Sequence, residues 1–273
     1  MLIITSTSLT TRFAAAHVVI LCLMLSGCLN TPRDNAAPES NALTASGKSA
    51  SGTSTSGHTD DATPETNNEL SAEAILAATL RGATNQYAAT KRVFNQAAKQ
   101  HFEKALRHYN AQDFDQALDL AQLLSKANNA PSAVWVLLGD IARAKQDINL
   151  AATHYTQAIA VNSANYFALN RLGTIAREQG DFQQAKQCYI DALSAWPGYA
   201  NGHYNLGILL DLYLGDKISA LNHYSDYHAL VSYPESQPAH HVDESLVKQI
   251  ERWMADVNRQ VSATATATGR PNE

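Results

Sequence analysis

Histidine, cysteine and carboxylate side chains are the groups in this sequence that could bind a metal ion or transfer protons. His154, Cys188 and His223 follow one another at intervals of about 34 residues, a spacing typical of helical repeats. Packed helices lie about 8–10 Å apart, whereas zinc bonds its ligands at about 2.0–2.3 Å. Equivalent side chains of successive repeats are therefore too far apart to share one metal ion, and we expect no metal site at these three residues.

The other groups of polar side chains have simple interpretations. Residues 240–244 combine two adjacent histidines with two acidic side chains; a loose surface metal site is one interpretation, but a polar loop is the simpler one. His101 and His108 share one face of a predicted helix and belong at the edge of its core. Asp113 and Asp115 fall in a predicted turn, where carboxylates favour helix capping.

Catalytic and cofactor-binding motifs are not recognisable in the sequence. It shows no arrangement of nucleophile, base and orienting group, no phosphate-binding loop and no dinucleotide fingerprint. The formal net charge is −5 at pH 7, and no basic patch is interleaved with aromatic residues, which argues against nucleic-acid binding. We therefore expect a protein that is not an enzyme, has no cofactor or metal, and takes neither nucleic acid nor a small-molecule substrate.

Residues 166–199 are predicted to form two short amphipathic helices joined by a tight turn. Gly180 and Asp181 interrupt the apolar pattern, as a turn dipeptide does, and Pro197 ends the second helix. A glycine within a helix costs about 1 kcal/mol relative to alanine, so Gly173 indicates a close approach of two helices. The apolar face consists of Leu169, Leu172, Gly173 and Ala176 in the first helix and of Phe182, Ala185, Tyr189, Ala192 and Leu193 in the second.

This arrangement resembles the tetratricopeptide (TPR) repeat. The register recurs at a period of about 34 residues, which gives four repeats at 98–131, 132–165, 166–199 and 200–231, the last with one extra residue within 211–216. The resemblance implies an all-α fold, a right-handed α-solenoid of about four helix pairs, and 45% apolar content is enough for its core. The signature positions of the family hold Leu172, Gly173, Ala185, Tyr189, Ala192 and Pro197, its turn is matched by Gly180, Asp181 and Phe182, and Leu169 replaces its tryptophan.

Helical segments flank the predicted repeats on both sides. Residues 69–97 contain an apolar stripe interrupted by Gly82, which fits one long helix, two short helices or a further degenerate repeat. Residues 243–261 form an amphipathic helix that we interpret as a cap over the last repeat; a helix that docks on a partner is the alternative. Residues 262–273 are expected to be a disordered tail.

The N-terminus resembles the signal sequence of a bacterial lipoprotein. An uncharged run at 13–25 follows Arg12; it is short for a membrane span, which needs about 20 residues, but suits a signal peptide at 1–27. Residues 25–28, Leu-Ser-Gly-Cys, resemble a lipobox, and this resemblance implies cleavage before Cys28 and acylation of that cysteine. An ordinary secretory signal and an N-terminal membrane anchor remain alternatives, because the residues before Arg12 carry no charge.

Residues 28–68 are predicted to form a disordered tether that begins with the lipidated cysteine. The segment is rich in Ser, Thr and Ala and has almost no large apolar side chains, so it cannot bury enough surface to offset the entropy of ordering. Leu29, in place of an aspartate after the cysteine, implies by the same resemblance sorting to the outer membrane of a Gram-negative bacterium. Cys22 lies in the signal peptide, which leaves Cys188 without a partner for an internal disulfide.

The TPR resemblance also implies where a partner binds. In that family the first helix of each pair lines a concave groove, with positions 2, 5, 9 and 12 of the repeat directed into it. Aromatic rings, arginines and amides at these positions suit an extended peptide, although a merely solvated face is the alternative. The insertion at 212–214 is a rival contact surface. The predicted groove residues are Phe102, Tyr109, Val136, Asp140, Arg143, Phe167, Asn170, Thr174, Arg177, Asn201, Tyr204 and Ile208.

We therefore expect a lipid-anchored TPR scaffold at the outer membrane, facing the periplasm, that binds a partner protein or peptide during envelope assembly. Bacterial lipoproteins that it resembles assist pilus or secretion-channel assembly or dock cell-wall enzymes. The alternative is a permanent accessory subunit of an energised membrane transport system. The sequence does not choose between these functions.

Overall fold

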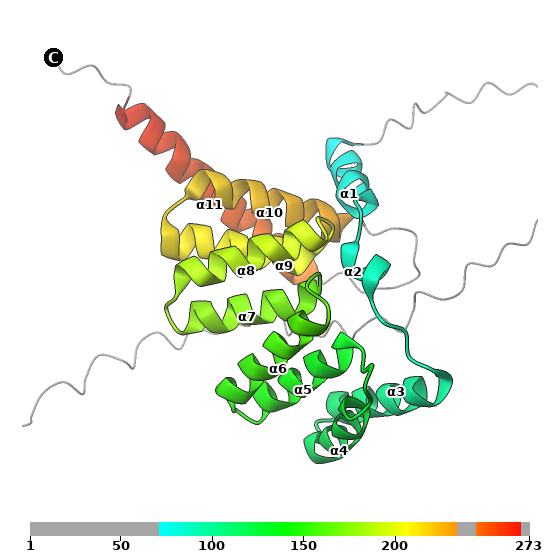
Figure 1. Ribbon diagram of the computed structural model, residues 1–273. Helices are drawn as coiled ribbons and strands as arrows, with labels where there is room; N and C mark the ends of the chain where they lie inside the picture. Colours follow the sequence, from blue (N-terminus) through cyan, green and yellow to red (C-terminus); the bar gives the residue numbers. More distant parts are fainter. Residues whose placement is uncertain (1–70, 234–243, 269–273) are drawn as a thin grey trace, which may run out of the picture. The chain divides into compact units, whose positions relative to one another are not determined.

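The computed structural model of the protein describes residues 71–233 and 244–268, which belong to one compact unit. The predicted signal peptide, Cys28 and the tether lie outside the described residues, as do His240 and His241. Every regular element in the described ranges is helical, so the fold is all-α, as expected (Figure 1).

The core of this unit consists of consecutive helix pairs that form a TPR-like α-solenoid. Each pair, α3–α4, α5–α6, α7–α8 and α9–α10, also packs against its neighbour along the chain (Figure 1). The elements are α1 (Ala72–Gly82), α2 (Gln86–Thr90), α3 (Gln96–Asn110), α4 (Phe114–Ser125), α5 (Ser132–Ala144), α6 (Ile148–Val161), α7 (Tyr166–Glu178), α8 (Phe182–Ala195), α9 (Ala200–Ile208), the π-helix η1 (Leu209–Leu214), α10 (Lys217–Ser232) and α11 (Glu244–Thr268).

The turn between the two helices of each pair follows one pattern. A residue with positive φ precedes an aspartate, and the aspartate caps the second helix by accepting a hydrogen bond from the backbone N–H three residues later. Glycine adopts positive φ without strain. Two of the four turns, including the predicted turn at 146–148 that lacks a glycine, have a glutamine at this position instead. The turn pairs are Gln112–Asp113, Gln146–Asp147, Gly180–Asp181 and Gly215–Asp216.

A tyrosine of the second helix covers a glycine of the first helix in three of the pairs. Each ring lies so close to its glycine that a Cβ there would overlap it. The three rings are also at most 1% exposed, so this contact sets the distance between the two helices. The pairs are Gly139–Tyr155, Gly173–Tyr189 and Gly207–Tyr224.

The fourth pair contains the π-helix η1, which accommodates the extra residue of that repeat. A π-helical turn inserts one residue into an α-helix without breaking its hydrogen-bonded ladder. Leu209 and Leu210 are buried, whereas Leu212 and Tyr213 are exposed. Gly215 then ends η1 in the left-handed conformation, with φ of 70°, and α10 resumes the repeat register.

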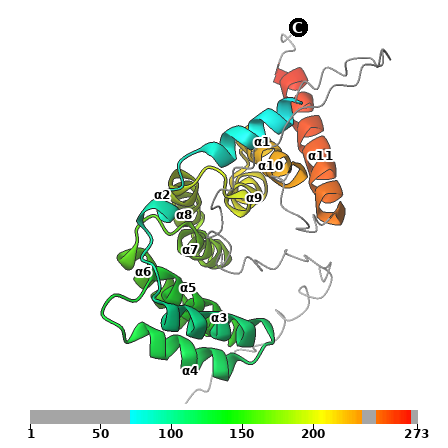
Figure 2. The ribbon, with the colours of Figure 1, turned by 90° about the vertical axis from the view of Figure 1, so that its right-hand side faces the viewer.

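The N-terminal helices α1 and α2 pack along the ends of the later repeats. The buried ring of Tyr87 contacts Tyr166 and Phe167 edge-on, with centroid distances of 5.6 and 6.1 Å. Gln86 donates a hydrogen bond of 2.9 Å to the Ser194 carbonyl at the end of α8. Arg81 donates to carbonyls at the end of α10, and α1 packs on α10 (Figure 2). Residues 72–90 therefore form two short helices that pack against the third and fourth helix pairs, and they are not a further repeat.

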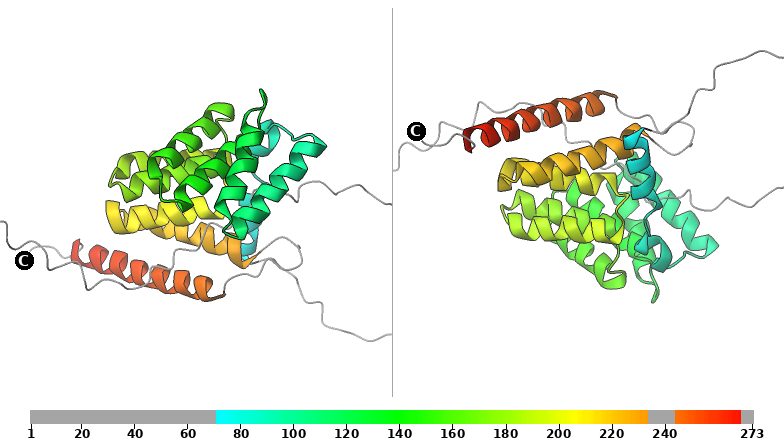
Figure 3. Two further views of the ribbon diagram at one scale, coloured as in Figure 1. Left: turned by 90° about the horizontal axis from the view of Figure 1, so that it is seen from below. Right: turned by 90° about the horizontal axis from the view of Figure 1, so that it is seen from above.

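The C-terminal helix α11 packs against α10 (Figure 3). Ile250 and Val257 are buried, and the Trp253 ring lies 6.3 and 6.1 Å from the rings of Tyr204 and Tyr224. The helix continues to Thr268, into a stretch expected to be a tail, in which alanine, the best helix former, alternates with the weaker helix former threonine. Among the described residues, no helix has the length and apolar character that a membrane span requires.

Candidate functional site

The predicted groove residues all lie on the first helices of the pairs, and the structure divides them by burial. The buried ones pack inside the array and present little surface to a ligand. The half-buried ones form the accessible part of the first helices, which we call the inner helices from here on. Phe102, Val136, Phe167, Asn170 and Tyr204 are buried, whereas Tyr109, Asp140, Arg143, Thr174, Arg177, Asn201 and Ile208 are half-buried.

Asp140 belongs to an ion pair that joins the second repeat to the third. Both oxygens of its carboxylate accept hydrogen bonds from the Arg171 guanidinium, at 2.5 and 2.9 Å. The Tyr155 hydroxyl donates a third bond of 2.7 Å to the same carboxylate. Burial, and then the nearby Asp140 charge, raise the pKa of Tyr155 well above 10, so this hydroxyl remains a donor at neutral pH. The network fixes one repeat against the next and leaves Asp140 little capacity for a ligand.

Arg143 and Arg177 are the two arginines at the ends of neighbouring inner helices, α5 and α7. One nitrogen of the Arg143 guanidinium donates a 2.5 Å hydrogen bond to Glu178, but its Nη1 is buried without a partner. In the described part of the chain, no hydrogen bond or ion pair involves the Arg177 guanidinium. This edge of the inner surface therefore has unused hydrogen-bond donors that carry positive charge.

Amides and hydroxyls continue from these arginines along α7. Asn170, Thr174 and Arg177 share one helix face, at steps of four and three residues. Asn170 Oδ1 accepts a 3.0 Å hydrogen bond from Asn205 of α9, while its buried Nδ2 has no partner. A buried amide donor without an acceptor is costly, so this group marks a place where a carbonyl from elsewhere would be favourable. Arg171 and Asn205, which the sequence did not single out, connect the repeats beside this face.

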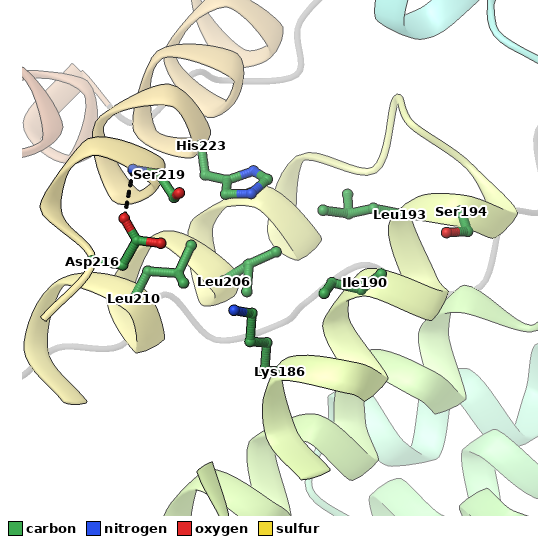
Figure 4. A pocket seen from close by; sticks show the side chains of 9 residues that line it. All are labelled: Lys186, Ile190, Leu193, Ser194, Leu206, Leu210, Asp216, Ser219 and His223. Atoms are coloured by element: carbon green, nitrogen blue, oxygen red, sulfur yellow. Dashed lines mark hydrogen bonds between the residues drawn. The ribbon is translucent and has the colours of Figure 1, made fainter. Parts of the chain in front are cut away.

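A cavity of about 330 Å³ lies in the last two repeats, where residues of α8, α9, η1 and α10 line it. Its wall is mostly apolar, with a lysine and an aspartate at one end (Figure 4). The cavity is lined by Lys186, Ile190, Leu193 and Ser194 of α8, by Leu206 and Leu210, and by Asp216, Ser219 and His223.

His223 at this cavity belongs to a cluster with His203 and Asp226. The two Nδ1 atoms lie 3.1 Å apart, and Asp226 Oδ2 lies 3.2 Å from His203 Nδ1 and 4.0 Å from His223 Nδ1. Burial, followed by the neighbouring His203, lowers the pKa of His223 to about 4. The sequence interpretation missed this cluster because it compared His223 with its equivalents in other repeats. A signal was present: His223 and Asp226 are three residues apart on a helix paired with the helix of His203.

Comparison with family models supports the repeat architecture. Residues 132–230 match the model of the TT21 fifth ARM repeats domain, and ARM repeats also stack helices into α-solenoids. The four helix pairs, their aspartate-capped turns and their glycine–tyrosine contacts agree with this match. The chain has a TPR-like repeat fold. No curated protein matches the sequence of this repeat protein significantly.

Solved structures with similar helix arrangements include MamA and Sgt2. A mutant of MamA is 17% identical, with a TM-score of 0.44, over 61% of this repeat protein and 88% of MamA. Another MamA structure is 15% identical, with a TM-score of 0.42, over 66% and 100% of the two chains. The Sgt2 TPR domain from Aspergillus fumigatus is 18% identical, with a TM-score of 0.39, over 52% and 86%. These values are too low to transfer any property of those proteins to this one.

Proposed function

We propose that this repeat protein is a scaffold that binds an extended, acidic peptide segment of a partner protein on the inner helices α5, α7 and α9. The observation that carries the proposal is the pair of arginines at the ends of α5 and α7. The Arg177 guanidinium has no partner among the described residues and is the main group open to a carboxylate, whereas Arg143 is paired with Glu178 and its unpaired Nη1 is buried. Both are half-buried, where a charge-assisted hydrogen bond is stronger than in bulk water.

The charge of the whole chain does not by itself attract an acidic segment. The net charge is −5, so attraction must come from local groups such as Arg177. A carboxylate on the peptide would pair with Arg177, and a backbone carbonyl would suit the Asn170 amide if the packing above it opened. The Thr174 hydroxyl, between them on α7, already donates to the Asn170 carbonyl and accepts from Tyr189.

The test is a fluorescence-anisotropy titration with a library of labelled acidic peptides and the same peptides with their carboxylates amidated. We expect binding of the acidic set only, weakened as salt rises. The Arg143→Ala/Arg177→Ala variant should bind about tenfold or more weakly, because a hydrogen bond to a charged group contributes about 1.5–3 kcal/mol. Arg252→Ala, which removes the same charge from exposed α11, should bind normally. Equal affinities for acidic and amidated peptides would refute the proposal.

We further propose that the scaffold is anchored by lipid at the outer membrane, faces the periplasm, and presents its partner during envelope assembly. The apolar run at 13–25 and the lipobox-like residues 25–28 support this localisation. A permanent role in an energised membrane transport system is the second candidate, favoured if the bound partner is a transport subunit.

Replacing Cys28 tests the anchor. We expect Cys28→Ala to move the protein from the membrane fraction to the soluble fraction of its own cells, because the cysteine is the only proposed acylation site. Cys188→Ala, which changes a half-buried thiol of α8, should leave the protein on the membrane. Membrane retention of Cys28→Ala would exclude lipid anchoring at this residue.

A further inference from the structure

The cluster of His203, His223 and Asp226 brings together three possible metal-binding atoms: the Nδ1 atoms of the two histidines and Oδ2 of the aspartate. His203 lies on α9, and the other two lie on α10, three residues apart on one face. His203 is 5% exposed and the other two are half-buried, so bulk water does not separate them. Each of the three atoms is within 4.0 Å of both others.

The protonation of His203 follows from its other contact. Its Nε2 lies 2.9 Å from the Pro197 carbonyl oxygen, which can only accept a hydrogen bond, so Nε2 carries the hydrogen. In the neutral ring Nδ1 then has a lone pair, directed at His223 Nδ1 and the Asp226 carboxylate. A hydrogen on His223 Nδ1 would satisfy the contact between the two rings, but the Asp226 carboxylate would still face the His203 lone pair at 3.2 Å. That contact is repulsive unless a second proton on His203 or a metal ion lies between the two atoms.

The distances between the three atoms favour a metal ion. They define a triangle, and the point equidistant from its corners lies about 2.0 Å from each atom, which is the length of zinc–imidazole and zinc–carboxylate bonds. A hydrogen bond from the outer ring nitrogen of a histidine to a carbonyl is the support that metal-ligating histidines commonly have. His203 has this support from Pro197.

We propose that His203, His223 and Asp226 form a three-ligand site for a divalent transition-metal ion of the zinc type. Two imidazoles and one carboxylate are a donor set suited to zinc and to its first-row neighbours. Three protein ligands leave a further position to water or another donor, and a tetrahedral arrangement requires His223 and Asp226 to approach each other from their 4.0 Å separation. His223 also lines the adjoining cavity (Figure 4).

A metal ion here would crosslink the two helices of the fourth repeat. His203 holds the site to the loop before α9 through Pro197, and the α10 ligands hold it to the helix on which α11 packs. Binding to the folded chain alone raises its thermal stability in proportion to the logarithm of metal concentration. The site therefore acts on the end of the repeat array, separately from the arginines proposed to bind a peptide.

The experiment is a titration of the full chain, freed of metal by a chelator that is then removed, with ZnCl₂ in a calorimeter. We expect one zinc ion per chain and a higher melting temperature with zinc than with EDTA. His223→Gln and Asp226→Asn should weaken binding by about tenfold or more, since the loss of even a supporting group beyond the ligands costs 10–100-fold. His154→Gln, at the equivalent position of the second repeat, should not weaken it.

Two further measurements make the result decisive. His240→Ala/His241→Ala removes adjacent histidines that could bind zinc adventitiously, and it should keep the full affinity. X-ray absorption of the unmutated, zinc-loaded chain should show two imidazoles and oxygen ligands at about 2.0 Å, whatever the variants do to folding. No zinc binding would assign the charge to a proton on His203 and overturn the proposal. Loss of binding in the His240/His241 variant alone would overturn it too.

Discussion

Replacing Asp140 with alanine is expected to lower the free energy of unfolding by about 3–5 kcal/mol, the usual effect of breaking a buried ion pair. The carboxylate is 13% exposed and its partner Arg171 is 8% exposed, so the substitution leaves a positive charge in a site with little water. It also removes the acceptor of the Tyr155 hydroxyl. The measurement is urea unfolding followed by far-UV circular dichroism.

The matched control for this substitution is Asp115→Ala. Asp115 also pairs across repeats, at 2.6 Å from the Lys145 ammonium, but it is 85% exposed; because water screens such a pair, we expect no measurable change in unfolding. Replacing both buried partners, as Asp140→Leu/Arg171→Met, should recover most of the loss, because no unpaired charge remains. Equally small effects of Asp140→Ala and Asp115→Ala would show that the buried pair contributes no more than a surface pair.

The second large effect is expected for Gly173→Ala. Alanine favours a helix over glycine by about 1 kcal/mol, which alone would stabilise α7. The new Cβ, however, would lie 2.6 Å from a ring carbon of Tyr189, whose side chain is 0% exposed and cannot move aside freely. Forced overpacking costs about 1–3 kcal/mol, so we expect a net loss of up to about 2 kcal/mol, measured by the same urea unfolding.

Gly82→Ala is the internal control for this comparison. A Cβ at Gly82, in α1, meets no atom within 4 Å, so this variant should be as stable as the original chain or slightly more stable. Combining Gly173→Ala with Tyr189→Leu should cost less than the sum of the two single substitutions, because the smaller side chain relieves the overlap. Stability unchanged by Gly173→Ala would mean that the ring shifts and that the glycine does not set the helix spacing.

The repeats were predictable because their contacts lie within about 34 residues of sequence. Gly173 and Tyr189 belong to one unit, and so do the turn and its capping Asp181, so a local pattern carries the information. The sequence predicted only that the fourth repeat contains one extra residue. The repeat pattern does not show which backbone hydrogen bonds accommodate that residue, so it did not predict the π-helix. Helix α11 extends past its apolar stripe into 262–268, where alternating alanine and threonine give no periodic signal that predicts a helix.

The candidate site was less predictable because its geometry depends on contacts between repeats. The family positions assigned Asp140, Asn170 and Arg177 to the first helices of their pairs, which are α5 and α7. They do not reveal that the Asp140 carboxylate is hydrogen-bonded to Arg171, or that Asn170 is buried and bonded to Asn205. Both facts depend on a side chain from the next repeat. The cluster of His203 with His223 was missed for a related reason: the pairing of α9 with α10, and not the repeat period, brings the rings together.

Helices α1 and α2 have a consequence for how the array unfolds. An array held only by neighbouring repeats can lose its terminal repeat while the rest stays folded. Here Arg81 is bonded to carbonyls 149 and 152 residues later in the chain, and Gln86 to one 108 residues later. The fourth repeat therefore cannot detach without breaking contacts made by residues that precede the first. These long-range bonds favour a single unfolding transition over stepwise fraying, at the expense of slower folding, because the chain must close long loops to form them.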